Sequence, residues 1–472
     1  MGDLAAIAGL GAISDSALAK IVGRFPAEQR GTDADERAVL KRLRELAHDT
    51  IDERHSIYGA VAQVLNMPST PGREDIKWSC ANISALICRM ANKSTAYRDA
   101  LRTWSEHSSY QRPLRMILYT DEIVPGNVLN QSNTRRFYSF YLSFLECGRS
   151  LSSELVWLFA GAMLTKDVKA VYGGLSTVIR VLLRSYFLGP LSLRHAGVNV
   201  MVGQGETRTL FIDFHGIWGD APAMLGAYGV KNSGGVRPCI KCKNCVLESS
   251  GLSDGEYLQA LGCYDLSKFD SASDHEIFET SDLLHEMARH ATSKRAASEA
   301  EKIHGQNINF EGLLQDADLR PHVSPASGSR YDAMHIVYAN GIARYEVQHM
   351  MQVLKEHMGL TFDDLQSVFP AGWRFPSALS HVLRYNKNTL FQGNRMSDCG
   401  WPILSASEML GALPVIRFFA EAIVEQSERC TDRVRKALNS FFAMVRVHET
   451  LDAVKKQRIG PEPLLEMLCG IH

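Results

Sequence analysis

The sequence predicts an α/β fold with a mixed-sheet core, a mainly helical insertion in that core, and a helical N-terminal region before it. Three observations support this prediction. Apolar residues recur at three- and four-residue steps up to about residue 105, which is the period of an amphipathic helix. Aromatic and aliphatic runs separated by turn-like segments follow, as in successive strands. Acids then stand where two of these runs end, at Asp121 and Asp220.

The N-terminal region, residues 1–110, is predicted to be helical. The segment "DERAVLKRLRELAHDTIDERHSIYGAVAQVL" has helical periodicity, and "WSCANISALICRMANKSTAYRDALRTW" continues it. Between them, "NMPSTPGRED" has the composition of a loop.

Residues 111–230 are predicted to form the first part of the core. Three strand-like runs, "RMILYTDE", "RRFYSFYLSFLE" and "SELVWLFAGAML", indicate an antiparallel meander. "GGLSTVIRVLLRSYFL" is typical of a helix, and a strand hairpin then leads to a strand that ends on Asp220, with a helix directly after it. This order is that of the ribonuclease-H-like fold, in which the first and fourth strands are neighbours. We therefore expect Asp121 and Asp220 to lie close together.

The remaining chain is predicted to be mainly helical. Residues 231–400 form an insertion that contains the cysteine cluster, and residues 401–472 form C-terminal helices that complete the core. Ser405 or Ser407 is the expected N-cap of the first of these helices, because serine side chains accept hydrogen bonds from the first backbone N–H groups.

Composition limits the classes of partner. The chain has 472 residues, 45% hydrophobic and 22% charged, with a net charge of −1. No overall basic field would attract nucleic acid, so such a partner needs a local patch. The longest apolar stretch, Leu155–Leu164, is too short to span a bilayer, and we expect no membrane partner. The candidate basic patches are Arg135–Arg136; Lys231 with Arg237, Lys241 and Lys243; and Arg433 with Arg435 and Lys436.

The acids indicate a divalent cation. Two hard cations held by carboxylates can activate an attacking oxygen and stabilise a leaving one in phosphodiester cleavage. Asp121 and Asp220 are the first two predicted ligands for Mg²⁺ or Mn²⁺. Glu408, in the first turn of the helix that opens at "SASEM", is the predicted third. The rivals for this third position are Glu421, Glu425, Glu346 and Glu356.

The segment "RPCIKCKNC" indicates a second metal. A CxxC pair, here Cys239 and Cys242, places two thiolates at one ion, and zinc needs two more ligands. Asp332 and His335 in "YDAMH" are the predicted pair, and Cys245 and Cys263 are the alternatives. Four protein ligands would make this zinc structural. Without the cysteines, "YDAMH" is better explained as a helix start with a capping Asp and an ordinary His, and with them the two interpretations are about even. The scattered remaining cysteines suit a reducing compartment.

In order, the motifs "LYTDEIVPGN", "RRFYSFYLSFLECG", "WGDAPAM", "GGVRPCIKCKN", "YDAMH" and "SASEMLGALPVI" resemble those of a known family. This family comprises the transposase-derived proteins abundant in dinoflagellate genomes, related to the CACTA and Plavaka group of DDE cut-and-paste DNA transposases. The resemblance covers about residues 112–430.

The resemblance implies a ribonuclease-H-like core and assigns roles to residues. Asp121 matches the first catalytic acid, Asp220 the second, and Glu408 the third. The CxxC and D-x-x-H elements match Cys239, Cys242, Asp332 and His335. It also implies Mg²⁺-dependent cleavage at transposon ends and joining to target DNA, a nuclear or otherwise cytoplasmic location, and a homo-oligomer.

Two features depart from the family pattern and keep an alternative open. No recognisable DNA-binding module precedes the core, unless the N-terminal helices serve, and the neutral charge is unusual for a protein that holds two DNA ends. The alternative is a domesticated, catalytically inactive module that binds nucleic acid or protein and retains a structural zinc site. A zinc-stabilised α/β scaffold unrelated to transposases is the third hypothesis. No G-x-S-x-G elbow or P-loop favours other chemistry.

Overall fold

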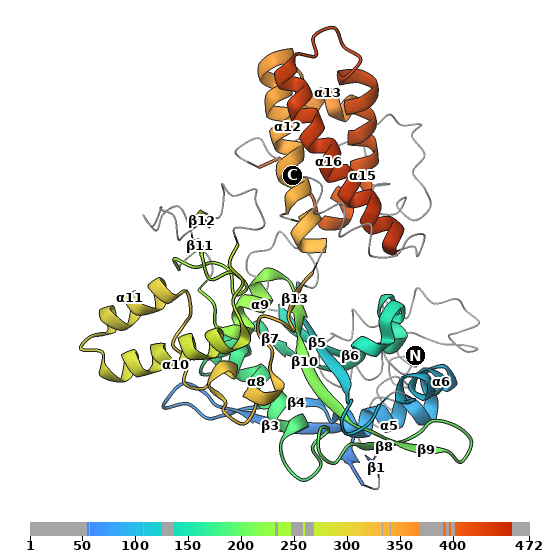
Figure 1. Cartoon of the computed structure of the whole chain (residues 1–472), viewed down its shortest axis with the longest axis vertical. Helices are drawn as coiled ribbons and strands as arrows, with labels where there is room; N and C mark the ends of the chain where they lie inside the picture. The colour runs from blue at the N-terminus through green and yellow to red at the C-terminus, as the bar shows by residue number, and fades with distance from the viewer. Residues whose placement is uncertain are drawn as a thin grey trace, which may run out of the picture. The chain divides into compact units, whose positions relative to one another are not determined.

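The computed structural model in Figure 1 divides the chain into two units, Met1–Arg330 and Tyr331–His472, each of which we describe by itself. The boundaries predicted at residues 110, 230 and 400 stay predictions. The helices predicted before residue 54, the turn at Pro125–Gly126 and the alternative zinc ligand Cys263 lie outside the described residues. The described residues are 54–455 without 56, 107, 125–135, 232–234, 247–257, 260–268, 333, 340, 369–389, 393–395 and 398–401.

A five-stranded mixed sheet forms the centre of the first unit. The strand order is β13-β10-β5-β6-β7. β5 pairs antiparallel with β6 and β6 with β7, and β10 lies parallel to β5. The mixed α/β fold, the antiparallel meander and the adjacency of the first and fourth core strands are therefore confirmed. The strands are β5 (Leu114–Ile123), β6 (Phe137–Phe144), β7 (Leu158–Leu164), β10 (Ile212–Gly219) and β13 (Arg330–Tyr331).

The middle of this sheet is buried. Met116, Ile117 and Leu118 of β5 are each 0% exposed, so consecutive residues, which point to opposite faces, are all covered. Helices α8 (Gly174–Phe187) and α9 (Ala221–Tyr228) pack together, and α9 contacts β5 and β10. β5 is covered on both faces in its middle, whereas Asp121 and Glu122 near its end are only half-buried.

A hairpin corrects the helical prediction for the N-terminal region. β3 (Ala62–Met67) pairs antiparallel with β4 (Ile76–Ala81), so the expected helix is wrong over these residues. The cause is tertiary packing: the Trp78 indole donates a 2.9 Å hydrogen bond to the carbonyl of Ala162 and lies edge-on to Phe140. The helical prediction is confirmed for the next segment, which forms α5 (Ile83–Lys93) and α6 (Thr95–Ser105).

The segment before β13 approaches β10 more closely than side chains would permit. The predicted hairpin is present as β8 (Val198–Met201) and β9 (Thr207–Leu210), followed by β10. In β10, the register with β5 shifts between Phe214 and Gly216. A Cβ atom on Gly328 would lie 1.8 Å from the carbonyl oxygen of His215, and one on Gly216 would lie 2.3 Å from that of Gly328. Both positions therefore require glycine.

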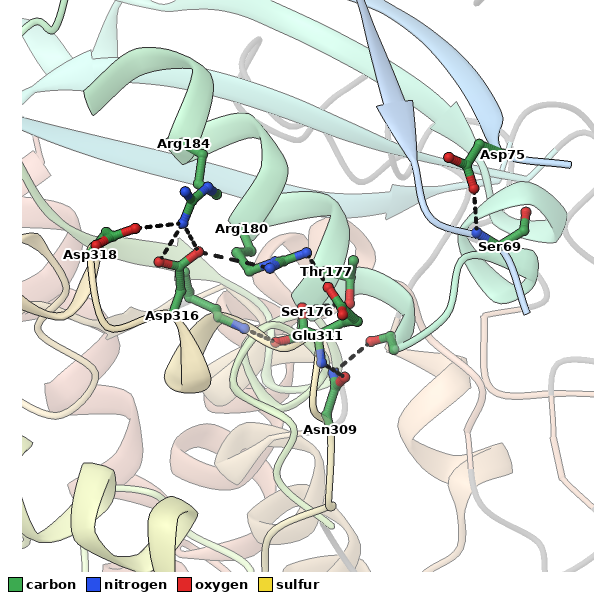
Figure 2. Close-up of polar contacts among 12 residues, drawn as sticks. Ser69, Asp75, Ser176, Thr177, Arg180, Arg184, Asn309, Glu311, Asp316 and Asp318 are labelled. Carbon is green, nitrogen blue, oxygen red and sulfur yellow. Dashed lines mark hydrogen bonds and ion pairs between the residues drawn. The ribbon is translucent and has the colours of Figure 1, made fainter. Parts of the chain in front are cut away.

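The described part of the insertion within the first unit includes a helical hairpin and an ion-pair network. Helices α10 (Asp274–His290) and α11 (Lys294–His304) pack side by side (Figure 1). The segment after α11 lies beside α8, and arginines of α8 form ion pairs with acids of this segment (Figure 2). Arg184 donates to both carboxylate oxygens of Asp316, at 2.8 and 2.7 Å, and is 3.2 Å from Asp318. Arg180 bonds Glu311 at 2.5 Å.

The described part of the second unit is helical, as predicted, and has its own core. α12 packs against α16, and Phe419 and Phe441 are 1% and 0% exposed. Ser405 caps α15, as one of the two predicted serines. Among the helices that the structure describes, none is long and apolar enough to cross a membrane. The helical segments are η8 (Met334–Ala339), α12 (Ile342–Met358), α13 (Phe362–Ser367), α15 (Ala406–Phe419), η10 (Ala420–Val424) and α16 (Asp432–Lys455).

Candidate metal centre

Asp121 and Asp220 meet at one end of the central sheet. The parallel register pairs Thr120 of β5 with Gly219 of β10, and each acid is the next residue in its chain. Each offers a carboxylate oxygen within 4.8 Å of one on the other. Both residues are half-buried. The juxtaposition expected from the order of strands and helices is therefore confirmed.

Asp220 has a second role as the N-cap of α9. Its Oδ1 accepts a 2.7 Å hydrogen bond from the backbone N–H of Ala223, and Pro222 occupies the first turn, where its fixed φ suits a helix start. A carboxylate at a helix N-terminus is also stabilised by the positive end of the helix dipole. The sequence "GDAPAM" therefore fixes the position of this acid through the start of the helix.

Glu122 follows Asp121 in β5 and lies beside Thr165 and Tyr138, and none of these three residues was predicted as a site residue. Thr165 donates a 2.7 Å hydrogen bond to the Glu122 carboxylate. Tyr138 of β6 faces Glu122 across the antiparallel pair. Burial raises the pKa of Tyr138, and the negative charges of Glu122, Asp220 and Asp121 raise it further. The adjacent acids in "TDE" and the alternation in "RRFYSFY" were the signals available for Glu122 and Tyr138.

The Asp121–Asp220 pair fits a hard divalent cation. Two oxygens that bind one Mg²⁺ at about 2.1 Å lie at most about 4.2 Å apart, close to the separation within 4.8 Å found between these carboxylates. The two carboxylates repel each other at this distance, and a divalent cation bound between them would attract both. Carboxylate oxygens suit Mg²⁺ and Mn²⁺ alike, so the donor set does not identify the ion.

The predicted third acid, Glu408, belongs to the second unit. It is 7% exposed, and its Oε2 accepts hydrogen bonds from the backbone N–H and hydroxyl of Ser405, at 2.9 and 3.0 Å. The hydroxyl in turn accepts from the Glu408 N–H, which completes a capping box. Helix capping therefore accounts for this carboxylate, and its role as a metal ligand stays a prediction.

The rivals for the third position also belong to the second unit. Glu421 pairs with Arg417 at 2.6 Å, and Glu356 accepts from Gln352 at 3.1 Å. Glu346 differs, because its Oε2 is buried with no hydrogen-bond partner among the described residues. A buried carboxylate oxygen without a partner is costly, which makes Glu346 the strongest of the rivals.

The two predicted zinc cysteines lie together in the first unit. Cys239 and Cys242 line a cavity of about 460 Å³ and are partly exposed. The pKa of Cys239 is lowered to about 6, because a hydrogen bond from the Cys242 thiol, together with backbone N–H groups and the Lys241 ammonium, outweighs the effect of burial. The same pairing raises the pKa of Cys242. The thiolate is the form that binds zinc, and at neutral pH most of Cys239 is in this form.

The other predicted zinc pair, Asp332 and His335, belongs to the second unit. The Asp332 carboxylate is 2.8 Å from His335 Nδ1, as the three-residue spacing predicts. Its other oxygen accepts from the Met334 backbone N–H at 2.8 Å, the capping role of the simpler interpretation. A carboxylate bound to Nδ1 orients the imidazole as in many metal-ligating histidines. The four-residue zinc site stays a prediction, since its two halves belong to different units.

No protein-family model matches this chain, and no curated protein matches its sequence.

Proposed function

We propose that the chain is a transposase-like DNA nuclease and strand transferase with a ribonuclease-H-like core. The observation that carries the proposal is the approach of two carboxylates, within 4.8 Å, from the ends of neighbouring parallel strands. This is the arrangement that metal-dependent phosphodiester chemistry needs. Glu408 is proposed as the third acid, and Glu346 is its rival.

The sheet topology supports the core assignment. Numbered along the core, the strand order β7-β6-β5-β10-β13 reads 3-2-1-4-5, with the second strand antiparallel and the fourth parallel to the first. In the ribonuclease-H-like fold the first and fourth strands are likewise central neighbours, and the acids sit at their ends.

In this proposal, the protein's own residues position the reacting groups. Asp121 and Asp220 would hold Mg²⁺ or Mn²⁺, which supplies charge stabilisation to the phosphate and a more acidic bound water. The α9 N-terminus fixes Asp220, and the burial of β5 fixes Asp121. The Tyr138 phenol is protonated at neutral pH and can donate a hydrogen bond, and its raised pKa extends this state to higher pH.

Further parts of the proposal follow from the resemblance. The partners are transposon ends and target DNA, the location is nuclear, and a homo-oligomer holds the two DNA ends. Zinc at Cys239, Cys242, Asp332 and His335 has a structural role.

The test is DNA nicking with either cation. We expect Mg²⁺- or Mn²⁺-dependent nicking of supercoiled plasmid by the purified chain, and its loss in Asp121→Asn and Asp220→Asn. Losing several kcal/mol of charge stabilisation lowers the rate by on the order of 10³-fold. Asp99→Asn makes the same chemical change at an exposed acid of α6 and should cut normally. Absence of cutting by the unaltered chain, or normal cutting by both core variants, would contradict the proposal.

A further inference from the structure

We propose that the turn between α10 and α11 binds the DNA phosphate backbone through Arg289, Lys294 and Arg295. This inference rests on the proposed function, because it concerns how that DNA is held. We call these three residues the hairpin tip. All three are exposed, and four residues separate the first from the second.

The hairpin tip carries charge that the protein does not use internally. Arg289, Lys294 and Arg295 form no ion pair with any described residue, and their nearest helical acids are engaged elsewhere. Glu286 bonds His290 at 3.2 Å, and Glu299 lies 3.9 Å from Lys302.

The acids farther from the turn also have partners. Asp282 bonds Arg320 at 2.8 Å, Glu276 bonds Lys243 at 3.1 Å, and Glu301 bonds Lys231 at 2.7 Å. Glu279 bonds His275, and Asp274 accepts from the backbone N–H of Ala326. The three tip cations are therefore left without an ion-pair partner among the described residues.

Helix stability does not account for two of the three charges. Lys294 and Arg295 stand in the first turn of α11, which contains no acid. The helix dipole disfavours cations at this end, typically by about 0.3–1 kcal/mol each. Residues that cost stability at an exposed turn indicate selection for something other than folding, and a polyanion compensates both the dipole and the side chains.

Most of a competing basic patch is engaged within the protein. Of the predicted patch of Lys231, Arg237, Lys241 and Lys243, Lys231 pairs with Glu301, and Lys243 pairs with Asp270 and Glu276. The Lys241 ammonium donates to the carbonyls of Ala326 and Ser329, at 2.8 and 2.7 Å. These lysines are used to hold the protein together. In a chain of net charge −1, exposed cations without an ion pair are the groups available for phosphate.

The test is the salt dependence of DNA binding in EDTA, where no metal chemistry occurs. Binding of a labelled duplex of about 30 base pairs would be followed by fluorescence anisotropy between about 50 and 200 mM KCl. Three variants are compared with the full chain: Arg289→Ala/Lys294→Ala/Arg295→Ala, the charge-preserving Arg289→Lys/Lys294→Arg/Arg295→Lys, and the control Arg73→Ala/Lys77→Ala/Lys93→Ala. The control removes three exposed cations from the first unit, outside the hairpin.

We expect the alanine variant of the tip to bind at least about tenfold more weakly at about 50 mM salt. The slope of log K against log salt should fall in magnitude by about 0.9 for each phosphate that the protein no longer neutralises. The charge-preserving variant and the control should bind like the full chain. Equal affinity and slope for the tip and control variants would overturn the inference, as would tip-dependent binding to phosphatidylserine vesicles without binding to DNA.

The two proposals fail separately. Duplex binding is measured in EDTA and nicking is measured with Mg²⁺ or Mn²⁺, so each proposal has its own readout. A chain that binds through its tip but never cuts supports the inference and contradicts the nuclease proposal. A chain that cuts DNA equally well with and without its tip charges supports the nuclease proposal and contradicts the inference about the hairpin tip.

Discussion

Thr120 of β5 pairs with Gly219 of β10 across two parallel strands, and Asp121 and Asp220 come directly after this pair. The paired strands hold these two carboxylates close together although their like charges repel each other. The first two predictions follow from this relationship.

Mg²⁺ should stabilise the folded chain through the Asp pair. A ligand that binds only the folded state adds about 2.7 kcal/mol to the free energy of unfolding at about 100 times its Kd. We expect Mg²⁺ to raise the melting temperature of the unaltered chain, and Asp121→Asn to abolish most of that rise. Differential scanning calorimetry with and without Mg²⁺ measures it. Asp99→Asn, at an exposed acid, is the control, and an unchanged Mg²⁺ response in Asp121→Asn would contradict the assignment.

Two substitutions of Asp220 should separate its capping role from its metal role. Asparagine caps helices about as well as aspartate, whereas alanine costs about 1 kcal/mol. In EDTA, Asp220→Ala should therefore unfold at lower urea than Asp220→Asn, while both variants lose the response to Mg²⁺. Equal urea midpoints for the two variants would mean that the hydrogen bond to Ala223 contributes nothing.

Asp316 should matter for stability far more than its neighbour Asp318 (Figure 2). The side chain of Asp316 is 2% exposed and bound through both oxygens to Arg184, which is itself 41% exposed. Asp316→Ala should lower the free energy of unfolding by about 1–3 kcal/mol, a range that allows for the partly solvated arginine. Asp318 is 65% exposed, so Asp318→Ala should cost less than about 0.5 kcal/mol. Urea titration measures both, and similar losses would contradict the prediction.

Gly328 should tolerate no side chain. An added Cβ would lie 1.8 Å from the His215 carbonyl oxygen, and backbone on both sides must then move. We expect Gly328→Ala to lose roughly 3 kcal/mol of stability or more. At Gly203, the nearest atoms belong to the flexible Glu206 side chain, 3.3 Å away. Gly203→Ala should unfold normally, and a normal melting temperature for Gly328→Ala would show that the segment does not lie against β10.

Cys239 should react as a thiolate from mildly acidic pH. Its pKa is lowered to about 6, so the thiolate predominates above that pH and disappears below it. In EDTA, alkylation of Cys239 by iodoacetamide should reach half its maximal rate near pH 6, as measured by peptide mass spectrometry. Cys80 and Cys88, whose pKa values burial raises to about 12, are internal controls. Half-maximal reaction of Cys239 near its ordinary pKa of 9 would contradict the prediction, and Zn²⁺ supplied in place of EDTA should protect it.

The Asp121–Asp220 pair was predictable because it depends on short segments and on their order along the chain. Three strand-like runs, a helix, and a strand ending on "GDAPA" allow few topologies, and in the expected one Asp121 and Asp220 must meet. The helix start at Asp220 was also predictable, since the acid and Pro222 favour it.

Long-range packing explains what the sequence alone could not predict. β3 and β4 have the spacing of a helix, but Trp78 gains a hydrogen bond and an aromatic contact only as part of a strand. Tyr138 lies in an aromatic strand-like run, and only the register with β5 brings it opposite Glu122. The ion pairs that engage Lys231 and Lys243 likewise come from distant segments.

The capping hydrogen bond of Asp220 bears on how related gene copies should be compared. A copy without the proposed metal chemistry would still be selected for a residue that starts α9, so an aspartate at this position does not by itself indicate a working site. Asparagine in place of Asp220 would keep the helix cap and remove the charge, so it would mark a copy that has lost the proposed metal site.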